Sequence, residues 1–184
     1  MNSYIAAMVF VALAFGILNA SEGETGLMYS EYGCYILTAP DGWVLGSASA
    51  KGIPILAVFY PKGQSYKDAK AIFYTTIFPK HGKNIDQIIQ GDISDFSSQH
   101  PQAKVTKESD LKTCEGSKVI VYTFVGDKWG NHDRIAYVDM PEMVVVVALQ
   151  AKNTNAHDQA LSAFEKLVNS FKPAANLKAT EEEP

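Results

Sequence analysis

Four histidines are the side chains of this sequence best suited to metal binding or acid–base chemistry. They are His81, His100, His132 and His157. None stands near another ligand type at a spacing that defines a metal site, and His132-Asp133 comes closest to a base beside its orienting carboxylate. Adjacent residues of a strand point to opposite faces, so these two would not hydrogen-bond to each other. We therefore predict no catalytic residue, no metal site and no cofactor.

Acidic pairs and serines add no reaction centre. Asp92 and Asp95 stand three apart at helical spacing and are expected on a solvated polar face. Asp139 and Glu142 flank a turn and lack the ligand density that calcium requires. The sequence contains no Gly-x-Ser-x-Gly motif and no phosphate-binding glycine loop. These patterns predict that the protein is not an enzyme.

The residue types that do favour a function are those of a protein-binding surface. Trp129 lies between Lys128 and Gly130 in a turn that has little core for an indole to enter. An exposed tryptophan beside charge is a typical anchor for a protein partner. We predict partner binding by Trp129 and Lys128, with His132 just after the turn. The alternative is that Trp129 folds back over the edge of the sheet.

The two cysteines, Cys34 and Cys114, are separated by about 80 residues. In an oxidising compartment they could form one long-range disulfide. Two separate buried thiols are the alternative, because only the distance between the two Cα atoms decides and the sequence does not supply it. A catalytic redox pair is not expected, because the chain has no Cys-x-x-Cys motif.

A series of short strands would position these residues. Apolar, β-prone runs separated by turn signatures occupy residues 32–38, 43–45, 53–60, 71–78, 118–125, 132–138 and 143–149. The last of these runs contains four consecutive valines and no polar residue. Such a strand must be central, with both faces covered, because an exposed one would be an aggregation hazard.

Two helices are predicted to cover the two faces of the sheet. Residues 84–100 carry isoleucines and a phenylalanine at helical spacing, with Asn84 as N-cap, Gln87 reaching back to it and Pro101 ending the segment. A second apolar stripe of helical period runs through residues 160–171. The predicted fold class is α+β, a mostly antiparallel sheet covered by helices on its faces.

The first twenty residues look like a secretory signal peptide. An uncharged apolar run at residues 5–18 has the length of a signal-peptide core and is shorter than a spanning helix requires. Ala20 offers a small residue for cleavage, but no Lys or Arg precedes the run. We expect a periplasmic or secreted protein, with a retained N-terminal segment that tethers it to a membrane as the alternative.

Composition and charge restrict the domain organisation and the class of partner. The chain has 184 residues, 47% of them hydrophobic, and a formal net charge of −4, which gives no reason to expect nucleic acid. We predict a signal peptide at 1–20, a short tether at 21–30, one α+β domain at 31–173 and a disordered acidic tail at 174–184.

Several short motifs resemble one known fold group. They are the opening strand, the turn Ala39-Pro40-Asp41-Gly42-Trp43, the hairpin around Met140-Pro141-Glu142, and the closing Phe164-Glu165-Lys166-Leu167-Val168-Asn169-Ser170-Phe171. Together they are similar to the MOG1/PsbP-like group, which includes PsbP, Mog1 and DcrB-type exported bacterial proteins. The resemblance covers roughly residues 31–173 and implies a fold. It carries over no functional residue.

Three hypotheses about function follow. The first is an exported, non-enzymatic protein that binds another protein or assists an envelope assembly, with membrane contact only if the N-terminal segment is retained. The second is a small-ligand carrier with a pocket between sheet and helix, lined by residues such as Phe59, Phe73 and Tyr122. An unrecognised enzyme is the third. A closed cavity would favour the carrier, and a cleft holding His132 against a carboxylate would favour the enzyme.

Overall fold

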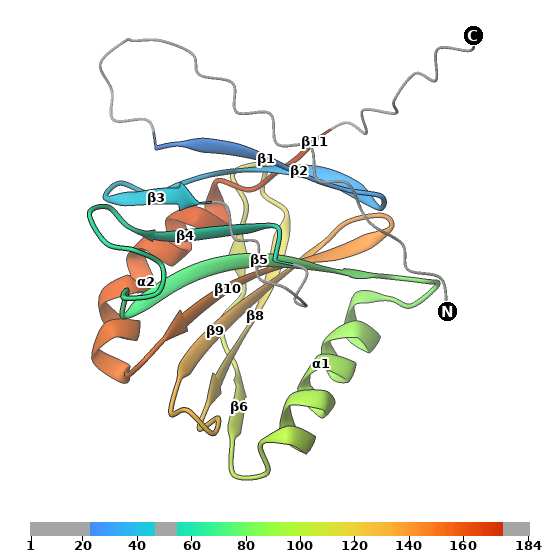
Figure 1. The fold of residues 1–184 in the computed structure, drawn as a ribbon. Helices are drawn as coiled ribbons and strands as arrows, with labels where there is room; N and C mark the ends of the chain where they lie inside the picture. Colours follow the sequence, from blue (N-terminus) through green and yellow to red (C-terminus); the bar gives the residue numbers. More distant parts are fainter. Residues whose placement is uncertain (1–22, 47–54, 175–184) are drawn as a thin grey trace, which may run out of the picture.

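The computed structural model describes residues 23–46 and 55–174 of the chain. The predicted signal peptide, and the predicted tail beyond Ala174, lie outside the described residues. The elements, shown in Figure 1, are β1 (Thr25–Ser30), β2 (Gly33–Thr38), β3 (Trp43–Gly46), β4 (Ala57–Pro61), β5 (Ala71–Pro79), α1 (Ile85–Gln99), β6 (Lys104–Lys107), β7 (Leu111–Lys112), β8 (Lys118–Val125), β9 (His132–Asp139), β10 (Met143–Ala151), α2 (Thr154–Asn169) and β11 (Lys172–Ala174).

The strands form two antiparallel sheets. The small sheet has the order β1-β2-β11, and the main sheet has the order β3-β4-β5-β10-β9-β8-β6, with β7 also paired to β8. The small sheet and α2 lie on one face of the main sheet, and α1 lies on the other (Figure 1). The predicted α+β fold class, a mostly antiparallel sheet with helices on its faces, is confirmed.

Strand β10 lies at the middle of the main sheet, between β5 and β9, as its valine run predicted. Alternate residues of a strand point to opposite faces, so one strand contributes to two cores. Val145, Val147 and Leu149 face α2 and the small sheet, whereas Val144 and Val146 face α1. All five are buried, so both faces of β10 are covered.

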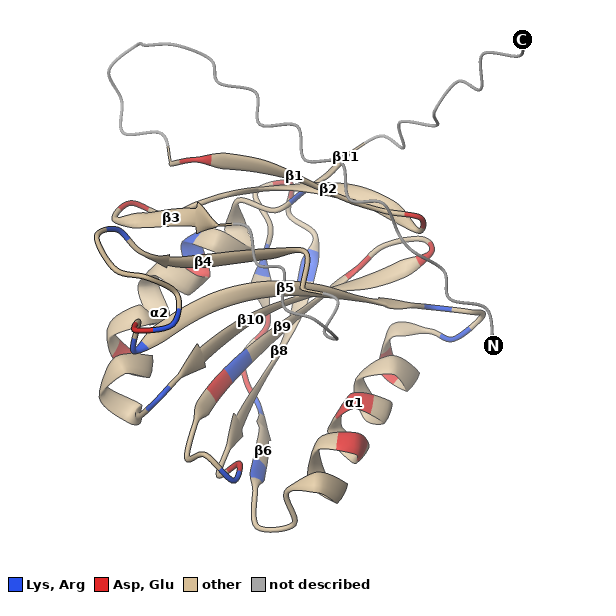
Figure 2. Ribbon diagram, in the orientation of Figure 1, with Lys and Arg blue, Asp and Glu red and all other residues tan. Residues whose placement is uncertain are grey.

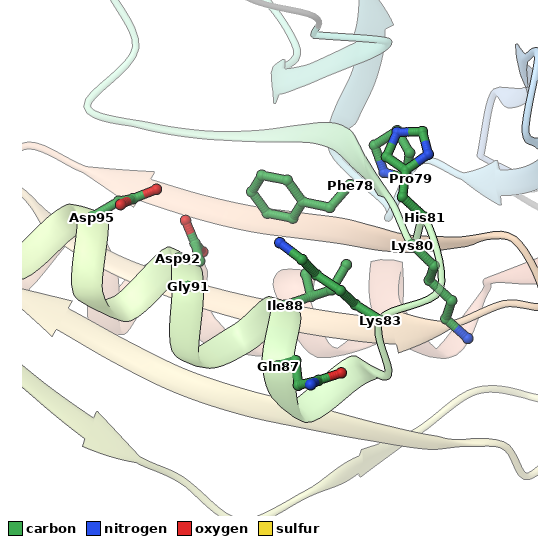
Figure 3. A pocket seen from close by; sticks show the side chains of 10 residues that line it. All are labelled: Phe78, Pro79, Lys80, His81, Lys83, Gln87, Ile88, Gly91, Asp92 and Asp95. Atoms are coloured by element: carbon green, nitrogen blue, oxygen red, sulfur yellow. The ribbon is translucent and has the colours of Figure 1, made fainter.

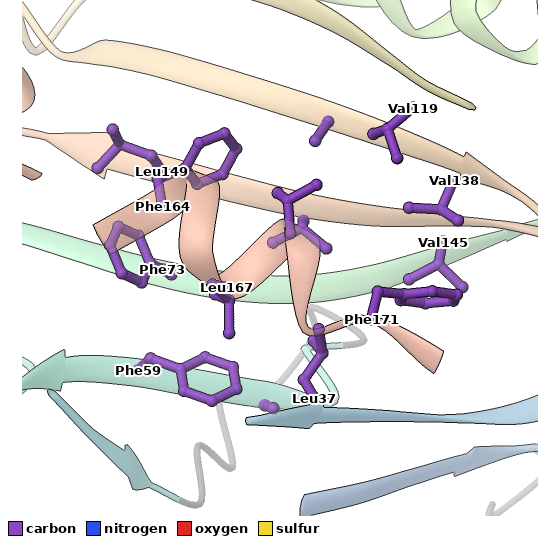
Figure 4. Close-up of a cluster of buried hydrophobic side chains, with 14 of the residues drawn as sticks. Leu37, Phe59, Phe73, Val119, Val138, Val145, Leu149, Phe164, Leu167 and Phe171 are labelled. Atoms are coloured by element: carbon purple, nitrogen blue, oxygen red, sulfur yellow. The ribbon is translucent and has the colours of Figure 1, made fainter. Parts of the chain in front are cut away.

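The larger core lies between the main sheet, α2 and the small sheet (Figure 4). Its largest side chains include Phe59 and Phe73 from the main sheet and Phe164 from α2. The ring of Trp43, the first residue of β3, stacks on Phe73 with 3.9 Å between centroids and so packs against the cluster. Each buried aromatic side chain removes a large apolar area from water, so these rings contribute strongly to the stability of the domain.

Helix α1 begins and ends where its sequence predicts. The Asn84 side chain accepts a hydrogen bond from the Gln87 backbone N–H, and the Gln87 side chain accepts one from the Asn84 N–H, which completes a capping box. His100 is the C-cap residue. Only Ile88 and Ile89 of this helix are buried, against five residues of α2. Helix α1 is therefore the more loosely packed of the two.

The segment predicted as a tether is structured over most of its length. Strand β1 occupies Thr25–Ser30 and pairs with β2 from Thr25 opposite Thr38 to Ser30 opposite Gly33. Met28 is buried in the larger core. These residues were expected in a short tether before the domain, and the structure instead places them in a strand, because β2 follows after a two-residue turn and Met28 enters the larger core.

Candidate functional site

The β8–β9 hairpin carries two of the predicted partner-binding residues, Lys128 and Trp129, in a turn of residues 126–131, here called the tryptophan turn. The Asp127 side chain accepts hydrogen bonds from two other residues of this turn. Its Oδ1 accepts hydrogen bonds from the backbone N–H groups of Trp129, at 2.9 Å, and Asn131, at 2.8 Å. Its Oδ2 accepts a third from the Asn131 side chain at 2.9 Å. Such Asx-type bonds hold a turn in one conformation, so Trp129 is presented from a fixed backbone.

Trp129 is the most exposed large apolar side chain of the described residues, with 67% of its surface accessible. The Lys128 ammonium lies 4.3 Å from the centroid of the indole ring, within the range of a cation–π contact. The indole therefore does not fold back into the core. Lys128 and Trp129 therefore lie together on an exposed turn.

A line of ring contacts joins Trp129 to the α1 side of the main sheet. The Trp129 ring centroid is 6.1 Å from that of His100, and His100 is 4.8 Å from Phe96. Phe96 in turn meets the buried Phe124 edge-on at 4.9 Å. These four residues, the aromatic row, run from the core to solvent across the end of α1. The buried ring of Phe124 at its base, together with the partly buried Phe96 and His100, therefore supports an exposed anchor at its tip.

His132, the third predicted binding residue, does not join the aromatic row. Its Nε2 lies 3.2 Å from Thr154 Oγ1 at the start of α2, and its ring centroid is 6.2 Å from that of His157. His132 therefore faces α2, whereas the next residue, Asp133, faces the α1 side. The opposite orientation of these neighbours agrees with the expectation that they do not act as a pair.

Sequence reasoning missed two contributors to this site, His100 and Asp127. Phe96 and His100 are four positions apart on one helix face, which indicates contact between them. Nothing in the sequence indicates that they also contact Trp129. Asp127 stands two residues before Trp129 in a glycine-flanked turn, a position at which aspartate commonly accepts backbone hydrogen bonds. That signal was present in the sequence and was overlooked.

A buried carboxylate lies on the strand that follows the turn. Asp133 is only 9% exposed, and its Oδ1 has no hydrogen-bond partner among the described residues. Burial and, to a smaller extent, the nearby charge of Asp127 raise the pKa of Asp133 to about 7, although a hydrogen bond with Gln150 acts in the opposite direction. Asp133 is therefore partly protonated near neutral pH.

A second carboxylate under α1 is also partly withdrawn from solvent. Asp92 was expected on a solvated face, but it is half-buried and accepts a 2.6 Å hydrogen bond from the Tyr137 hydroxyl. Burial raises the pKa of Asp92, and the bond from Tyr137 lowers it by a smaller amount. The expectation was wrong because Tyr137, on β9, reaches across to this helix. Asp95, by contrast, is exposed.

A half-open hollow of about 220 Å³ lies between the end of β5 and α1 (Figure 3). Phe78 and Ile88 supply apolar surface, Lys83 reaches in from the turn before α1, and Asp92 and Asp95 lie further along the helix (Figure 3). It is not the closed cavity that the carrier hypothesis required.

The residues named for that carrier cavity lie on different faces of the main sheet. Phe59 and Phe73 are buried in the core that contains α2, whereas Tyr122 packs on the α1 side. They cannot line one cavity. The carrier hypothesis therefore loses the feature on which it was based.

The cysteines are not joined to one another. Cys34 is buried on β2 with its Sγ 3.9 Å from the Ala174 carbonyl, and Cys114 is exposed with its Sγ 3.7 Å from the Phe171 carbonyl. The structure contains no Cys34–Cys114 disulfide, contrary to the first of the two alternatives. Cys34 fits the second alternative, a buried thiol, and Cys114 does not because it is exposed.

Residues with catalytic or metal-binding chemistry are dispersed. No group of three His, Cys, Asp or Glu side chains is placed to hold a metal ion within residues 23–46 and 55–174. His157 Nδ1 lies 3.0 Å from the exposed carboxylate of the adjacent Asp158. The hydrogen bond of the His132 ring is to a threonine hydroxyl rather than to a carboxylate.

Neither helix of the described chain is long and apolar enough to cross a membrane.

Comparison with solved structures identifies the architecture. The solution structure of PsbP (CyanoP) from Synechocystis sp. PCC 6803 matches with a TM-score of 0.55 at 14% identity, covering 88% of this chain and 98% of that one. A mutant of the protein Mog1 matches with a TM-score of 0.52 at 14% identity, covering 84% of this chain and 96% of that one. The chain has a MOG1/PsbP-like fold.

The crystal structure of the Saccharomyces cerevisiae Ran-binding protein Mog1p is also similar, at a TM-score of 0.49 and 13% identity, over 75% of this chain and 89% of that one. No family model matches the sequence, and no curated protein matches it. At these identities the MOG1/PsbP-like fold is what the chain shares with these proteins, and residue roles do not transfer.

Proposed function

We propose that the protein is an exported, non-enzymatic protein that binds another protein through the tryptophan turn. The observation that carries the proposal is Trp129, an exposed indole on a turn held by three hydrogen bonds that the Asp127 carboxylate accepts, and supported by the aromatic row. Tryptophan anchors of this kind supply a large share of the binding energy at protein interfaces.

The fixed backbone of the turn favours a role for Trp129 in binding a partner, beyond its being exposed to solvent. A partner that buries Trp129 would not have to order the turn first, so little conformational entropy would be lost on association. Lys128 adds a positive charge beside the ring, and α1 next to it carries acidic residues and no basic one. The surface therefore offers an aromatic centre with a polar rim, which is the usual composition of a protein interface.

Export is the part of the proposal that rests on residues 1–20 alone. Their apolar run followed by Ala20 is typical of a cleaved signal peptide. N-terminal sequencing of the protein isolated from its native cells would test it. A chain that starts at Ser21 supports export with cleavage, and an intact Met1 contradicts cleavage.

The binding surface can be tested by photo-crosslinking from two matched positions. A photoreactive phenylalanine analogue is placed at residue 129 in one sample and at residue 66 in the other. Tyr66 is a suitable control because it is an exposed aromatic residue, 44% accessible, with the Lys67 ammonium 5.9 Å from its ring. We expect one reproducible adduct from position 129 and none of that mass from position 66.

Affinity for the crosslinked partner then gives the energetic test. Trp129→Ala should weaken binding by about thirtyfold, the loss expected for an interface hot spot, whereas Tyr66→Ala should leave it unchanged. Equal binding by wild type and Trp129→Ala would contradict the proposal. Far-UV circular dichroism of both variants confirms that the fold is retained.

A further inference from the structure

Strand β1 forms an edge of the small sheet. In the part of the chain that the structure describes, β1 pairs with β2 alone, and β2 has β11 on its other side (Figure 1). Two of its side chains, Leu27 and Tyr29, are 43% and 51% exposed. Both lie on the face opposite the buried Met28, so the outer surface of this edge is apolar.

The backbone of β1 has hydrogen-bonding groups directed away from β2. The Ala39 N–H donates to the Glu24 carbonyl at 2.8 Å, which makes Glu24 and Ala39 a hydrogen-bonded pair of the antiparallel ladder. Such pairs alternate along the strand, so Gly26 and Met28 also exchange bonds with β2. Thr25, Leu27 and Tyr29 therefore direct their N–H and C=O groups to the open edge.

The edge strands of the two sheets differ in charge. β6, at one edge of the main sheet, carries Lys104 and Lys107, and lysine on an edge opposes pairing with another strand (Figure 2). β1, with the sequence TGLMYS, carries no charge. An uncharged edge of six residues with exposed apolar side chains lacks this protection.

We propose that β1 pairs antiparallel with β1 of a second copy of this chain, across a twofold axis through Leu27. In this register Leu27 lies opposite Leu27 of the other copy, and Thr25 lies opposite Tyr29. The three residues that direct their backbone groups outward thereby meet the same three, in reverse order. About six backbone hydrogen bonds would form, and two small sheets would become one.

Complementarity favours a second copy over another strand as the occupant. Thr25 and Tyr29 each lie two residues from Leu27. In this register every outward-directed residue therefore lies opposite another outward-directed residue, and neither strand has to turn its other face. The flanking acidic residues do not meet each other, because Glu24 lies opposite Ser30 and Glu31 falls beyond Thr25 in this register. No like charges are placed opposite one another, which removes the usual penalty for self-pairing.

The first test measures the oligomeric state of the full chain and how one introduced charge, at residue 27, changes it. Light scattering is recorded from about 5 µM to about 500 µM, because paired strands alone form a small interface that dissociates on dilution. We expect the dimer fraction to rise with concentration. Leu27→Lys places two like charges at the axis and should weaken dimerisation by about tenfold or more. Tyr66→Lys is the matched control, since Tyr66 is 44% exposed and lies in the β4–β5 loop.

Amide exchange tests the register residue by residue. Between the lowest and highest concentration, the Thr25, Leu27 and Tyr29 amides should become slower to exchange, while those of Gly26 and Met28, already paired to β2, should change little. Protection of any other set contradicts the register.

Three results would overturn the proposal outright. They are a monomer at every concentration, a dimer that Leu27→Lys leaves intact, and a dimer lost equally in Tyr66→Lys. A monomer that binds a foreign strand at β1 would also overturn it. The test does not depend on the tryptophan turn, because Trp129→Ala should dimerise as the wild type does.

Discussion

At the scale of single residues, Asp133 and Asp127 link the stability of the fold to the tryptophan turn. Asp133 is buried with one oxygen lacking a partner in the described structure, and the charge of Asp127 contributes to its raised pKa of about 7. Asp127 simultaneously holds the turn that presents Trp129. The Asp127 carboxylate thus holds the candidate binding surface in place, and its charge also disfavours ionisation of Asp133.

The raised pKa of Asp133 predicts that stability falls as pH rises through neutrality. The folded state keeps a proton on Asp133 up to about pH 7, whereas the unfolded chain releases it near 3.8. The stabilisation is therefore complete below about pH 4 and is lost progressively as pH rises through 7, by at most about 4 kcal/mol. Asp133→Asn should flatten this dependence and raise the melting temperature at pH 8. Thermal unfolding from pH 5 to pH 8 measures it.

The exposed Asp95→Asn variant is the control for this pH series. It should keep the wild-type slope, because Asp95 lies on the solvent side of α1. A wild-type protein whose melting temperature is independent of pH between 5 and 8 would contradict the account of Asp133.

Removal of the Asp127 side chain should loosen the tryptophan turn. Asp127→Ala eliminates three hydrogen bonds to residues 129 and 131. We expect backbone order parameters below about 0.6 at residues 127–131, against about 0.85 in the flanking strands. ¹⁵N relaxation measures this. Order parameters unchanged from wild type would show that the turn is held by other contacts.

At the scale of elements, α1 is attached to the sheet by few interactions. Ile88 and Ile89 are its buried side chains, and the Tyr137 hydroxyl binds Asp92 at 2.6 Å. Helix α2 buries five side chains in the larger core. Because local opening follows the amount of buried apolar contact, α1 should open before the sheet does. Its C-terminal end carries His100, so this opening would also disturb the aromatic row.

The Tyr137–Asp92 hydrogen bond should contribute measurably to the attachment of α1. Tyr137→Phe leaves the half-buried Asp92 without its donor, which costs about 1–3 kcal/mol for a charged acceptor. Native-state hydrogen exchange should show faster exchange along α1, while the amides of β10 follow global unfolding. Equal loss of protection in α1 and β10 would mean that the helix does not open separately.

At the scale of the whole molecule, one buried hydrogen bond joins the two sheets. Tyr35 of the small sheet donates its hydroxyl hydrogen bond to Thr75 Oγ1 of the main sheet at 2.9 Å, and both residues are completely buried. The Tyr35 ring also stacks on Phe171, 5.4 Å away between centroids. This pair therefore connects the layer that contains β1 to the centre of the domain.

Tyr35→Phe should destabilise the whole domain by about 1–3 kcal/mol, because the Thr75 hydroxyl is left unpaired in the core. Thr75→Val in the Tyr35→Phe background removes the unpaired group and should recover much of the loss. Chemical denaturation of the four proteins in this cycle measures the coupling. Strictly additive losses would contradict the hydrogen bond between the sheets.

Local sequence patterns were sufficient for both helices and for the longer strands of the main sheet, but not for β1, β6, β7 or β11. The Asn84 and Gln87 side chains specified the start of α1, and the valine run of residues 144–147 required a central strand with two covered faces. The exposure of Trp129 was one of the two alternatives that the sequence offered. These features depend on neighbours within a few residues, where periodicity and capping act.

The two helices and the central strand could be read from the residues alone, whereas the sequence left two alternatives for Trp129. The packing of the folded chain was needed to place His100 beside Trp129, the Tyr137 hydroxyl on Asp92 and β1 at the edge of the small sheet, and to show that Cys34 and Cys114 form no disulfide. Each of these features depends on residues that are distant along the chain. Their distances follow from the order of strands and the packing of helices, which no local pattern encodes.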